Sequence, residues 1–359
     1  MAREMTYADS GVDRELRASS KTALRILRKT YRFSHYGKVL RLPYGNVFPF
    51  GGDRYLDLAV EGVGTKVLVA QLAGKYDTVG IDGIAMAVND VIRSGARPLA
   101  VVDNIHTEIS DLSLVKQLMK GIVKGAEEAH CIVAGGEIGD VPELIRGLPA
   151  KIGLDIVVAA VGEVHKHGLI FGKALEPGDL IVGLRSSGIH SNGVSLARKI
   201  LFEQWGGKYR PEDIPEGLDR ELAHEVLEPT KIYADSLLAA TAEGKVKAAV
   251  HITGDAFLKF SRLARFSKKI GFELDNFKPQ EVFELIQRTA SQLGCKVTDK
   301  EMFRTFNMGW GFALIVEKSE LDMTLDVLEH TGIQAEKIGH VTDLEGITIF
   351  HKGNKIVLQ

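Results

Sequence analysis

The chain has 359 residues, 45% of them hydrophobic and 26% charged, a balance typical of a globular protein long enough for two domains. Its formal net charge of −2 argues against the strongly basic class that binds nucleic acids or anionic membranes. No apolar run reaches the ~20 residues of a membrane helix, and the first residues lack the apolar core of a signal peptide. We therefore expect a cytoplasmic protein with neither a nucleic-acid nor a membrane partner.

The chain opens with a polar stretch up to residue 20 and a basic segment, residues 21 to 31, for which we expect a helix. Residues 32 to 54 are rich in glycine, proline and aromatic residues. Flexible linkers lack such aromatic content, so this stretch predicts an ordered loop, placed over an active site.

The stretch around which the chain is organised begins with E-G-V-G-T-K, residues 61 to 66, directly after an apolar strand-like run. A glycine-rich turn at a strand end leaves backbone N–H groups free, which suits a phosphate. We therefore predict that Glu61, Gly62, Gly64, Thr65 and Lys66 bind a nucleotide cofactor. Lys66 would add a mobile positive charge, and Glu61 is a candidate metal ligand.

Residues 81 to 92 repeat apolar side chains at helical spacing, and Asp82, Asn89 and Asp90 interrupt that pattern. An Asn-Asp pair on a mostly apolar helix indicates oxygen ligands for Mg²⁺, an ion usually held by one or two carboxylates and nucleotide phosphates. A solvated polar face, or a hydrogen bond from helix to loop, explains the pair equally well on this helix alone. We assign Asp82 and Asn89 to cofactor binding and Asp90 to the metal.

The rest of the first half alternates strands and helices, which indicates a mixed α/β domain. A strand is expected at residues 99 to 102, an amphipathic helix at 111 to 129, and a short strand at 131 to 134 that ends in G-G-E. We predict that Gly135 and Gly136 contact the cofactor and that Glu137 is a metal ligand. The character of the sequence changes near residues 165 to 170, which divides the chain into domains of residues 1 to 167 and 168 to 359.

The second half begins with a strand at residues 180 to 184, a loop S-S-G-I-H-S-N-G at 186 to 193, and a helix at 194 to 205. A strand, a Gly/Ser loop and a helix N-terminus form a common anion site. Ser187 and Gly188 are therefore predicted phosphate contacts, and His190 and Asn192 predicted catalytic residues. The structural alternatives are a helix cap by Ser191 or Asn192 and a histidine that only holds the loop.

Further along, we expect a helix after residue 227, a strand at 248 to 252, a helix at 279 to 293 and a strand at 312 to 316. A helix capped by Ser319 and a terminal β-hairpin turned at residues 352 to 354 complete the chain. The carboxylates near glycine-rich strand ends suit Mg²⁺ with a nucleotide polyphosphate. No Walker A motif is present, so residue chemistry alone indicates an enzyme that uses ATP and Mg²⁺ outside the P-loop class.

Nine motifs in this order resemble the phosphoribosylformylglycinamidine cyclo-ligase, or aminoimidazole ribonucleotide synthetase, family. They are G-V-D (11 to 13), G-V-G-T-K (62 to 66), Y-D-T-V-G-I-D with A-M-A-V-N-D (76 to 90), G-A-R-P-L (95 to 99), G-G-E (135 to 137), S-S-G-I-H-S-N-G (186 to 193), E-P-T-K-I-Y (228 to 233), H-I-T-G (251 to 254) and R-T-F-N-M-G-W-G (304 to 311).

The resemblance implies a fold of two α/β domains. The N-terminal domain would bind ATP and Mg²⁺ and contribute strands to a barrel shared between two subunits of a homodimer. The C-terminal domain would be a sandwich-like α/β synthetase domain. The implied reaction uses ATP to phosphorylate the amide oxygen of formylglycinamidine ribonucleotide. Ring closure then releases phosphate and gives aminoimidazole ribonucleotide, a step of purine biosynthesis. On this reading His190, Lys66 and Asn192 carry the catalysis.

The chain departs from the family pattern at three places. Glu61 stands where aspartate is usual, residues 138 to 140 read I-G-D after G-G-E, and Asp255 and Ala256 replace glycine-rich sequence after H-I-T-G. A thiamine-monophosphate kinase-like enzyme and a non-catalytic nucleotide-binding scaffold remain alternatives. Selenophosphate synthesis would need a reactive cysteine in an N-terminal loop, whereas the two cysteines are Cys131 and Cys295.

Overall fold

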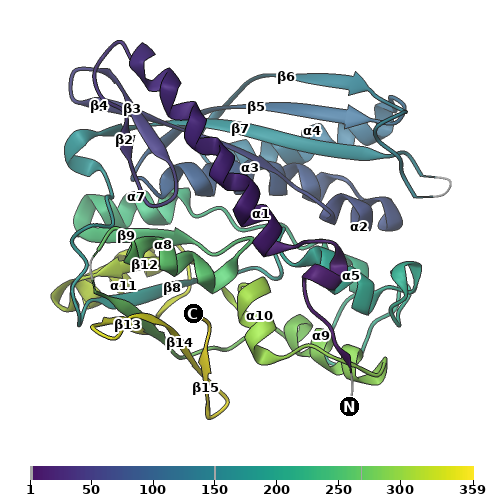
Figure 1. Ribbon diagram of the computed structural model, residues 1–359. Coiled ribbons are helices and arrows are strands. Elements are labelled where there is room, and N and C mark those ends of the chain that lie inside the picture. Colours follow the sequence, from purple (N-terminus) through teal and green to yellow (C-terminus); the bar gives the residue numbers. More distant parts are fainter. Residues whose placement is uncertain (1–2, 149–150, 268) are drawn as a thin grey trace.

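The computed structural model describes residues 3–148, 151–267 and 269–359. A six-stranded sheet forms the core of the N-terminal half, with strand order β2-β3-β4-β7-β5-β6 (Figure 1). Its strands are β2 (Leu40–Arg41), β3 (Asn46–Gly51), β4 (Arg54–Gly62), β5 (Arg97–Thr107), β6 (Ile132–Asp140) and β7 (Leu154–His165). The sheet is antiparallel except for the edge strand β6, which runs parallel to β5.

Helices cover one face of this sheet, which we call the inner face (Figure 1). They are α2 (Lys66–Ala73), α3 (Asp77–Ile92) and α4 (Leu112–Glu128). Glycine lets α3 and α4 approach closely, because a Cβ added at Gly80 would lie 2.4 Å from the Leu118 carbonyl oxygen. The opposite, outer face carries exposed apolar side chains, among them Leu58 and Val60, with 55% and 64% of their surface accessible.

A seven-stranded sheet forms the C-terminal half, in the order β15-β14-β10-β13-β8-β12-β9. Its strands are β8 (Leu180–Arg185), β9 (Val246–His251), β10 (Gly271–Leu274), β12 (Trp310–Val316), β13 (Ala335–Thr342), β14 (Gly346–His351) and β15 (Asn354–Val357). The helices of this half are α5 (Val194–Leu201), α6 (Leu222–Val226), α7 (Ala234–Glu243), α8 (Phe260–Ala264), α9 (Glu281–Gln292), α10 (Asp299–Thr305) and α11 (Leu321–His330). Helix α3 of the first half also contacts α7, so it lies between the two sheets (Figure 1).

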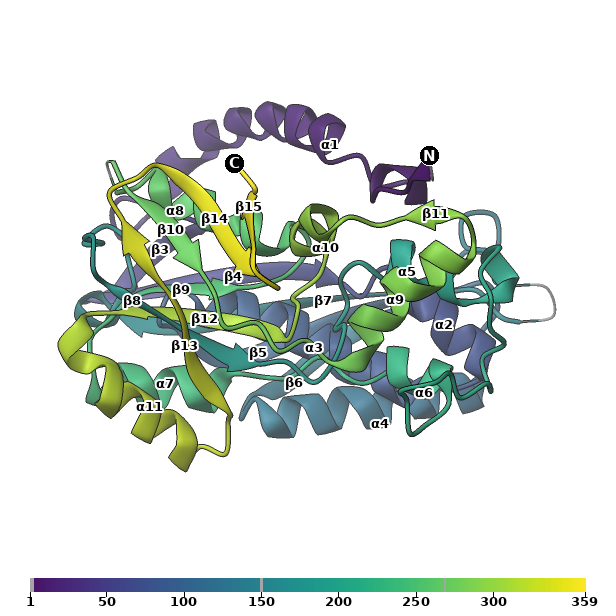
Figure 2. The ribbon, with the colours of Figure 1, turned by 90° about the horizontal axis from the view of Figure 1, so that it is seen from below.

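The N-terminal segment starts on the C-terminal half and then crosses the molecule. Strand β1 (Arg3–Glu4) pairs with β11 (Cys295–Lys296). The short helix η1 (Ala8–Ser10) follows, and then α1 (Arg14–Ser20), capped by the Asp13 carboxylate, and the 3-10 helix η2 (Lys21–Phe33). Helices α1 and η2 have no buried residue and run along the outside of the body (Figure 2).

Several sequence predictions are confirmed, including the helix at 111 to 129, the loop at 186 to 193 and the C-terminal hairpin. The expected loop at 32 to 54 is partly strand, because β2 and β3 pair with their neighbours. G-G-E lies inside β6 rather than at a strand end. The helix predicted at 194 to 205 ends at Leu201, and Glu320, not Ser319, precedes the first residue of α11. The division into residues 1 to 167 and 168 to 359 stays a prediction.

Candidate functional site

A cleft of about 530 Å³ lies where the glycine-rich turn after β4, the loop before α5 and the N-terminal segment meet. Its ionisable lining comes from both halves of the chain and from α1 and η2. The charged lining residues are Arg17, Lys21, Glu61, Asp90, Arg93, Asp255, Lys259 and Arg262. Five cations against three carboxylates make this cleft suitable for an anionic ligand.

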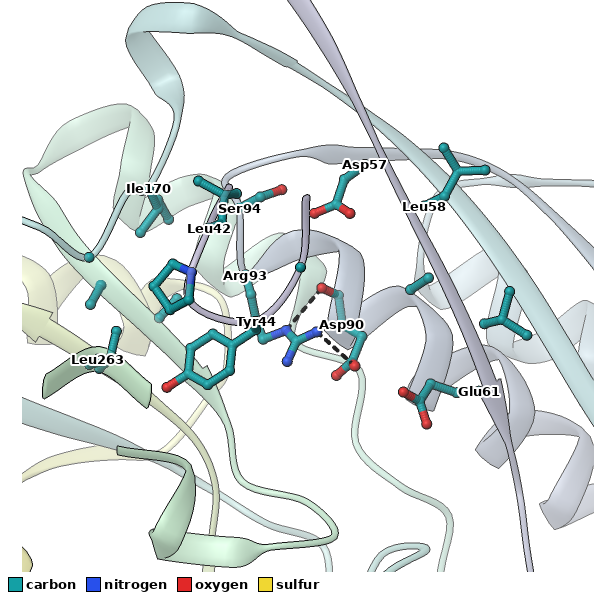
Figure 3. A pocket seen from close by; sticks show the side chains of 17 residues that line it. Leu42, Tyr44, Asp57, Leu58, Glu61, Asp90, Arg93, Ser94, Ile170 and Leu263 are labelled. Atoms are coloured by element: carbon teal, nitrogen blue, oxygen red, sulfur yellow. Dashed lines mark hydrogen bonds and ion pairs between the residues drawn. The ribbon is translucent and has the colours of Figure 1, made fainter. Parts of the chain in front are cut away.

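A smaller cavity of about 160 Å³ adjoins the cleft and shares Tyr44, Glu61, Asp90 and Arg93 with it. The turn between β2 and β3 forms one wall, and Asp57 of β4 contributes a further carboxyl (Figure 3). Burial raises the pKa of Asp57 to about 6. The carboxyl groups of this cavity therefore outnumber its positive charges, so the carboxyl groups cannot all be stabilised as anions.

Asp90 is the most strongly held carboxylate of the site. Its Oδ1 lies 2.8 Å from Nδ1 of His251. Its Oδ2 lies 2.7 Å from Nη2 of Arg93 (Figure 3). Burial opposes ionisation, but Arg93, the hydrogen bond from His251 and the charge of Lys259 together hold the pKa of Asp90 well below its usual value. Asp90 is therefore an anion at neutral pH, and its unused lone pairs are available to a cation.

Glu61 lies on the inner face of β4 beside Asp90, as the sequence predicts for a shared metal site (Figure 3). Burial, and then repulsion from the Asp90 charge, raise the pKa of Glu61 to about 7. Two neighbouring carboxyls that resist joint ionisation fit a divalent cation, which would replace the shared proton. The described residues contain no cluster of three metal-ligating side chains, so Mg²⁺ would also need phosphate oxygens as ligands.

The raised pKa of Glu61 predicts a pH-dependent stability. From about pH 4.5, its ordinary value, to about pH 7, the folded protein keeps a proton that the unfolded chain has released. The free energy of unfolding should therefore fall as pH rises through this window, by about 2–3 kcal/mol from this one group. Urea unfolding in metal-free buffer of the wild type and of Glu61→Gln measures it, because the Asp57 contribution is common to both. If the free energy of unfolding changes with pH in the same way in the wild type and in Glu61→Gln, the prediction is contradicted.

Lys66 and Asp82 form a buried ion pair instead of facing the cleft. Both side chains are fully buried, with Lys66 Nζ 2.9 Å from Asp82 Oδ2. Lys66 also donates to the Glu228 carbonyl at 2.6 Å, and Asp82 accepts from the backbone N–H and hydroxyl of Thr230. The sequence prediction of a mobile lysine at the mouth of the turn is therefore not supported by this position. The two residues instead join the halves of the chain.

Asn89 and Thr65 also connect the two halves. The Asn89 amide donates to the Lys231 carbonyl at 2.8 Å and accepts from the Tyr233 N–H at 3.0 Å. Thr65 Oγ1 lies 2.8 Å from Ser195 Oγ at the start of α5. Both polar atoms of the Asn89 side chain therefore have a backbone partner in the C-terminal half. Thr65, Gly62 and Gly64 do line the cleft, as the predicted anion-binding turn requires.

His190 is completely buried and does not line the cleft. Its Nε2 lies 3.2 Å from the N–H of Ser187 and 3.5 Å from that of Lys231, both of which donate to it. Burial, reinforced by the charge of Lys66, lowers the pKa of His190 well below its usual value. Because the basic nitrogen already accepts from the backbone, this geometry favours the loop-holding role over that of a general base.

We therefore expect His190→Ala to lose stability and activity together. The substitution strands the Ser187 N–H and introduces alanine at a left-handed backbone position, φ 63°. A buried donor without a partner costs about 1–3 kcal/mol. His190→Asn should lose less, because asparagine tolerates this conformation and keeps an acceptor. Melting temperature and turnover, measured on both variants, test this. A turnover loss of ~10²-fold at an unchanged melting temperature would restore the catalytic assignment.

The other residues predicted to act in this loop differ in whether they line the cleft. Asn192 lines the cleft, and its Oδ1 accepts from the Gly254 N–H at 2.7 Å. Its buried Nδ2 has no hydrogen-bond partner among the described residues, so it can donate to a ligand. Ser187 and Gly188 lie outside the cleft lining, and the Ser187 hydroxyl donates to the Pro229 carbonyl.

Glu137 does not join Asp90 within one chain. One row of register partners crosses the sheet: Glu137 on β6 lies opposite Asn104 on β5, Asn104 opposite Val157 on β7, and Val157 opposite Gly62 on β4. Partners in register point to one face, and Glu61, the neighbour of Gly62, points to the other. Glu137 therefore lies on the outer face, whereas Asp90 lies beneath the inner one. Gly135 and Gly136 are also on β6 and outside the cleft.

The sequence reading missed several cationic residues of the site. Arg93 follows Asp90 by three positions, directly after the last residue of α3, a spacing that signals an ion pair. Lys259 is buried at the cleft near the carboxyls, and burial lowers its pKa to about 8. The histidine of H-I-T-G, His251, was singled out as part of a motif but not as the partner of Asp90. Burial lowers its pKa to about 4, so it meets Asp90 as a neutral donor.

Comparison with known proteins places this geometry in a family. The sequence profile described as AIR synthase related protein, N-terminal domain, matches residues 44–164, and the corresponding C-terminal domain matches residues 176–352. Among solved structures, tt0281 from Thermus thermophilus has a TM-score of 0.60 at 15% identity, covering 90% of this chain and 95% of that one. E. coli HypE, a hydrogenase maturation protein, has a TM-score of 0.58 at 16% identity, covering 85% of each chain.

Sequence relatives are much more similar. The phosphoribosylformylglycinamidine cyclo-ligase of Methanocaldococcus jannaschii is 39% identical, over 98% of this chain and 95% of its own. That of Pyrococcus furiosus is 36% identical, over 98% of this chain and 100% of its own. Within the described residues, no helix is long and apolar enough to cross a membrane. With two domain profiles matched and full-length relatives above 30% identity, the chain belongs to the phosphoribosylformylglycinamidine cyclo-ligase family.

Proposed function

We propose that the protein closes the imidazole ring of formylglycinamidine ribonucleotide at the expense of ATP. The products are aminoimidazole ribonucleotide, ADP and phosphate. The observation that carries this proposal is the cleft between the two halves, where a glycine-rich turn and two coupled carboxyls, Glu61 and Asp90, meet five cationic side chains. Such a site suits phosphoryl transfer, which depends on positioning and charge neutralisation. Full-length identity to named cyclo-ligases supports it.

The residues of the cleft can be given roles in this reaction. Mg²⁺, held by Glu61 and Asp90, would neutralise charge on the ATP phosphates. The turn at residues 62 to 65 lines the same cleft, and the Val63 N–H already donates to the Ile156 carbonyl, so the N–H groups of Gly64 and Thr65 would bind the phosphate oxygens. Lys259 would offset charge as the γ-phosphoryl group moves to the amide oxygen, and the free amide N–H of Asn192 would orient the substrate.

A coupled assay of ADP release tests the proposal. Release should require formylglycinamidine ribonucleotide, and aminoimidazole ribonucleotide should form in equal amount. Thiamine monophosphate is the control substrate, because a related kinase would phosphorylate it. ADP release with thiamine monophosphate, or nucleotide binding without release under any condition, would overturn the proposal.

We also propose a homodimer that covers the outer face of the six-stranded sheet. Leu58, Val60 and Val102 are exposed there, and an uncovered apolar sheet face favours association. Light scattering at micromolar concentration should give a mass of twice 39.2 kDa. Val60→Asp should shift the protein toward the monomer, while Val123→Asp, at an exposed position of α4, should leave the mass unchanged. A monomeric wild type would exclude the dimer.

A further inference from the structure

Three of the five cationic side chains of the cleft have been given no individual role in the reaction proposed above. Arg17 and Lys21 come from the N-terminal segment, and Arg262 comes from α8. Burial, and then the charges of Arg262 and Arg17, lower the pKa of Lys21. The three charges therefore act on one another in a partly desolvated space, which favours an anion between them.

The N-terminal segment presents two of these cations, Arg17 from α1 and Lys21 from the start of η2. Arg14, Arg17 and Lys21 are separated by three and four positions, so they point the same way. Arg14 anchors the segment to α10, donating to Glu301 at 3.0 Å and to the Arg304 carbonyl at 2.9 Å. One turn later, Arg17 donates to the Asp255 carboxylate.

Asp255 holds two of the three cations. Its Oδ1 accepts from Arg17, and its Oδ2 lies 3.4 Å from Nη2 of Arg262. One carboxylate between three cations leaves the group with positive charge, and most of the guanidinium N–H donors stay available.

A second observation shows that the same cleft has hydrogen-bonding capacity to spare. Only 5% of the Asn192 surface is accessible, and its Nδ2 has no partner among the described residues although it borders the cleft. Gly254, which donates to the Oδ1 of Asn192, is the direct neighbour of Asp255. A buried amide donor and a cationic cluster are thus joined by two consecutive residues of one loop.

We propose that Arg17, Lys21 and Arg262 form a subsite for the 5′-phosphate of the ribonucleotide, and that Asp255 positions Arg17 within it. Guanidinium groups bind phosphate oxygens in pairs and need no metal ion. The ATP phosphates, in contrast, would be bound beside Glu61 and Asp90, which require a cation. The subsite rests on the proposed function for the identity of its ligand, while its chemistry, a sugar-phosphate dianion, stands independently.

Steady-state kinetics separates the subsite from the ATP site. Arg17→Ala and Arg262→Ala should each raise the KM for the ribonucleotide about tenfold or more, with kcat and the KM for ATP nearly unchanged. Arg25→Ala, an exposed cation on the same segment, is the matched control and should change neither constant. Equal increases in both KM values, or none, would overturn the proposal.

The sign of the effect at position 255 tests the positioning role. If Asp255 holds Arg17 in place, Asp255→Asn raises the KM for the ribonucleotide. If the carboxylate only repels the phosphate, the same variant lowers this KM, and the positioning role fails.

Calorimetric binding of ribose 5-phosphate, with ribose as control, needs no turnover. If ribose 5-phosphate binds to the wild type but not to the double variant Arg17→Ala/Arg262→Ala, the subsite is supported even if the enzyme assay fails. If the wild type turns over the ribonucleotide but does not bind ribose 5-phosphate, the subsite is overturned.

Discussion

Asp90→Asn is expected to lower ribonucleotide-dependent ADP release by about 10²–10³-fold, the loss typical of removing one charge-stabilising group from an active site. The amide keeps the shape and a hydrogen-bond acceptor for His251, but it removes the negative charge that pairs with Arg93 and would hold Mg²⁺. Because Arg93 is left without its counter-ion, a moderate fall in melting temperature should accompany the loss.

The matched control for this variant is Asp77→Asn at the start of the same helix. The Asp77 side chain is 43% exposed and pairs with a similarly exposed Lys75, so its charge contributes little. Turnover and melting temperature of this variant should stay close to those of the wild type. Turnover of Asp90→Asn at the wild-type rate in saturating Mg²⁺ would remove Asp90 from the metal site.

Lys66→Met is expected to destabilise the fold by about 3–5 kcal/mol, because it leaves the Asp82 carboxylate buried without its partner. The double variant Lys66→Met/Asp82→Asn should recover a large part of this loss, since no buried charge then remains. Urea unfolding measures both. Lys75→Met removes a lysine from an exposed pair and should cost about 1 kcal/mol or less.

The same experiment decides between two roles for Lys66. The sequence predicts a lysine that reaches ATP from a glycine-rich turn, and the structure gives it a buried structural partner. A Lys66→Met protein of wild-type stability that has lost turnover would contradict the structural role and restore the catalytic one. Loss of stability with recovery in the double variant would confirm the ion pair.

Local patterns predicted much of the fold. The glycine-rich turn between β4 and α2, the amphipathic α4 and the terminal hairpin each follow from periodicity and turn residues within one stretch of chain. Strands β10 and β13 were not predicted. Strand β10 has only four residues, and both strands form through pairing partners distant in the sequence.

The candidate site was less accessible to sequence reasoning, because its contacts depend on tertiary structure. His251 meets Asp90 across 161 positions, and no spacing within either motif signals this. Glu137 and Glu61 are both carboxylates near glycines, but the strand register places them on opposite faces of one sheet. Residue type predicted which chemistry is present, and only the register and the packing of α3 show which groups share a site.

Helix α3 has one further consequence, for how the protein unfolds. Three of its polar residues bond to the C-terminal half: Asp82 to Thr230, Asn89 to the backbone of residues 231 and 233, and Asp90 to His251. The halves cannot swing apart without breaking all three connections and exposing the buried polar groups that make them. Amide protons of α3 and of residues 230 to 233 should therefore exchange with solvent at a common slow rate. Although each half has its own sheet, the chain should melt as one cooperative unit.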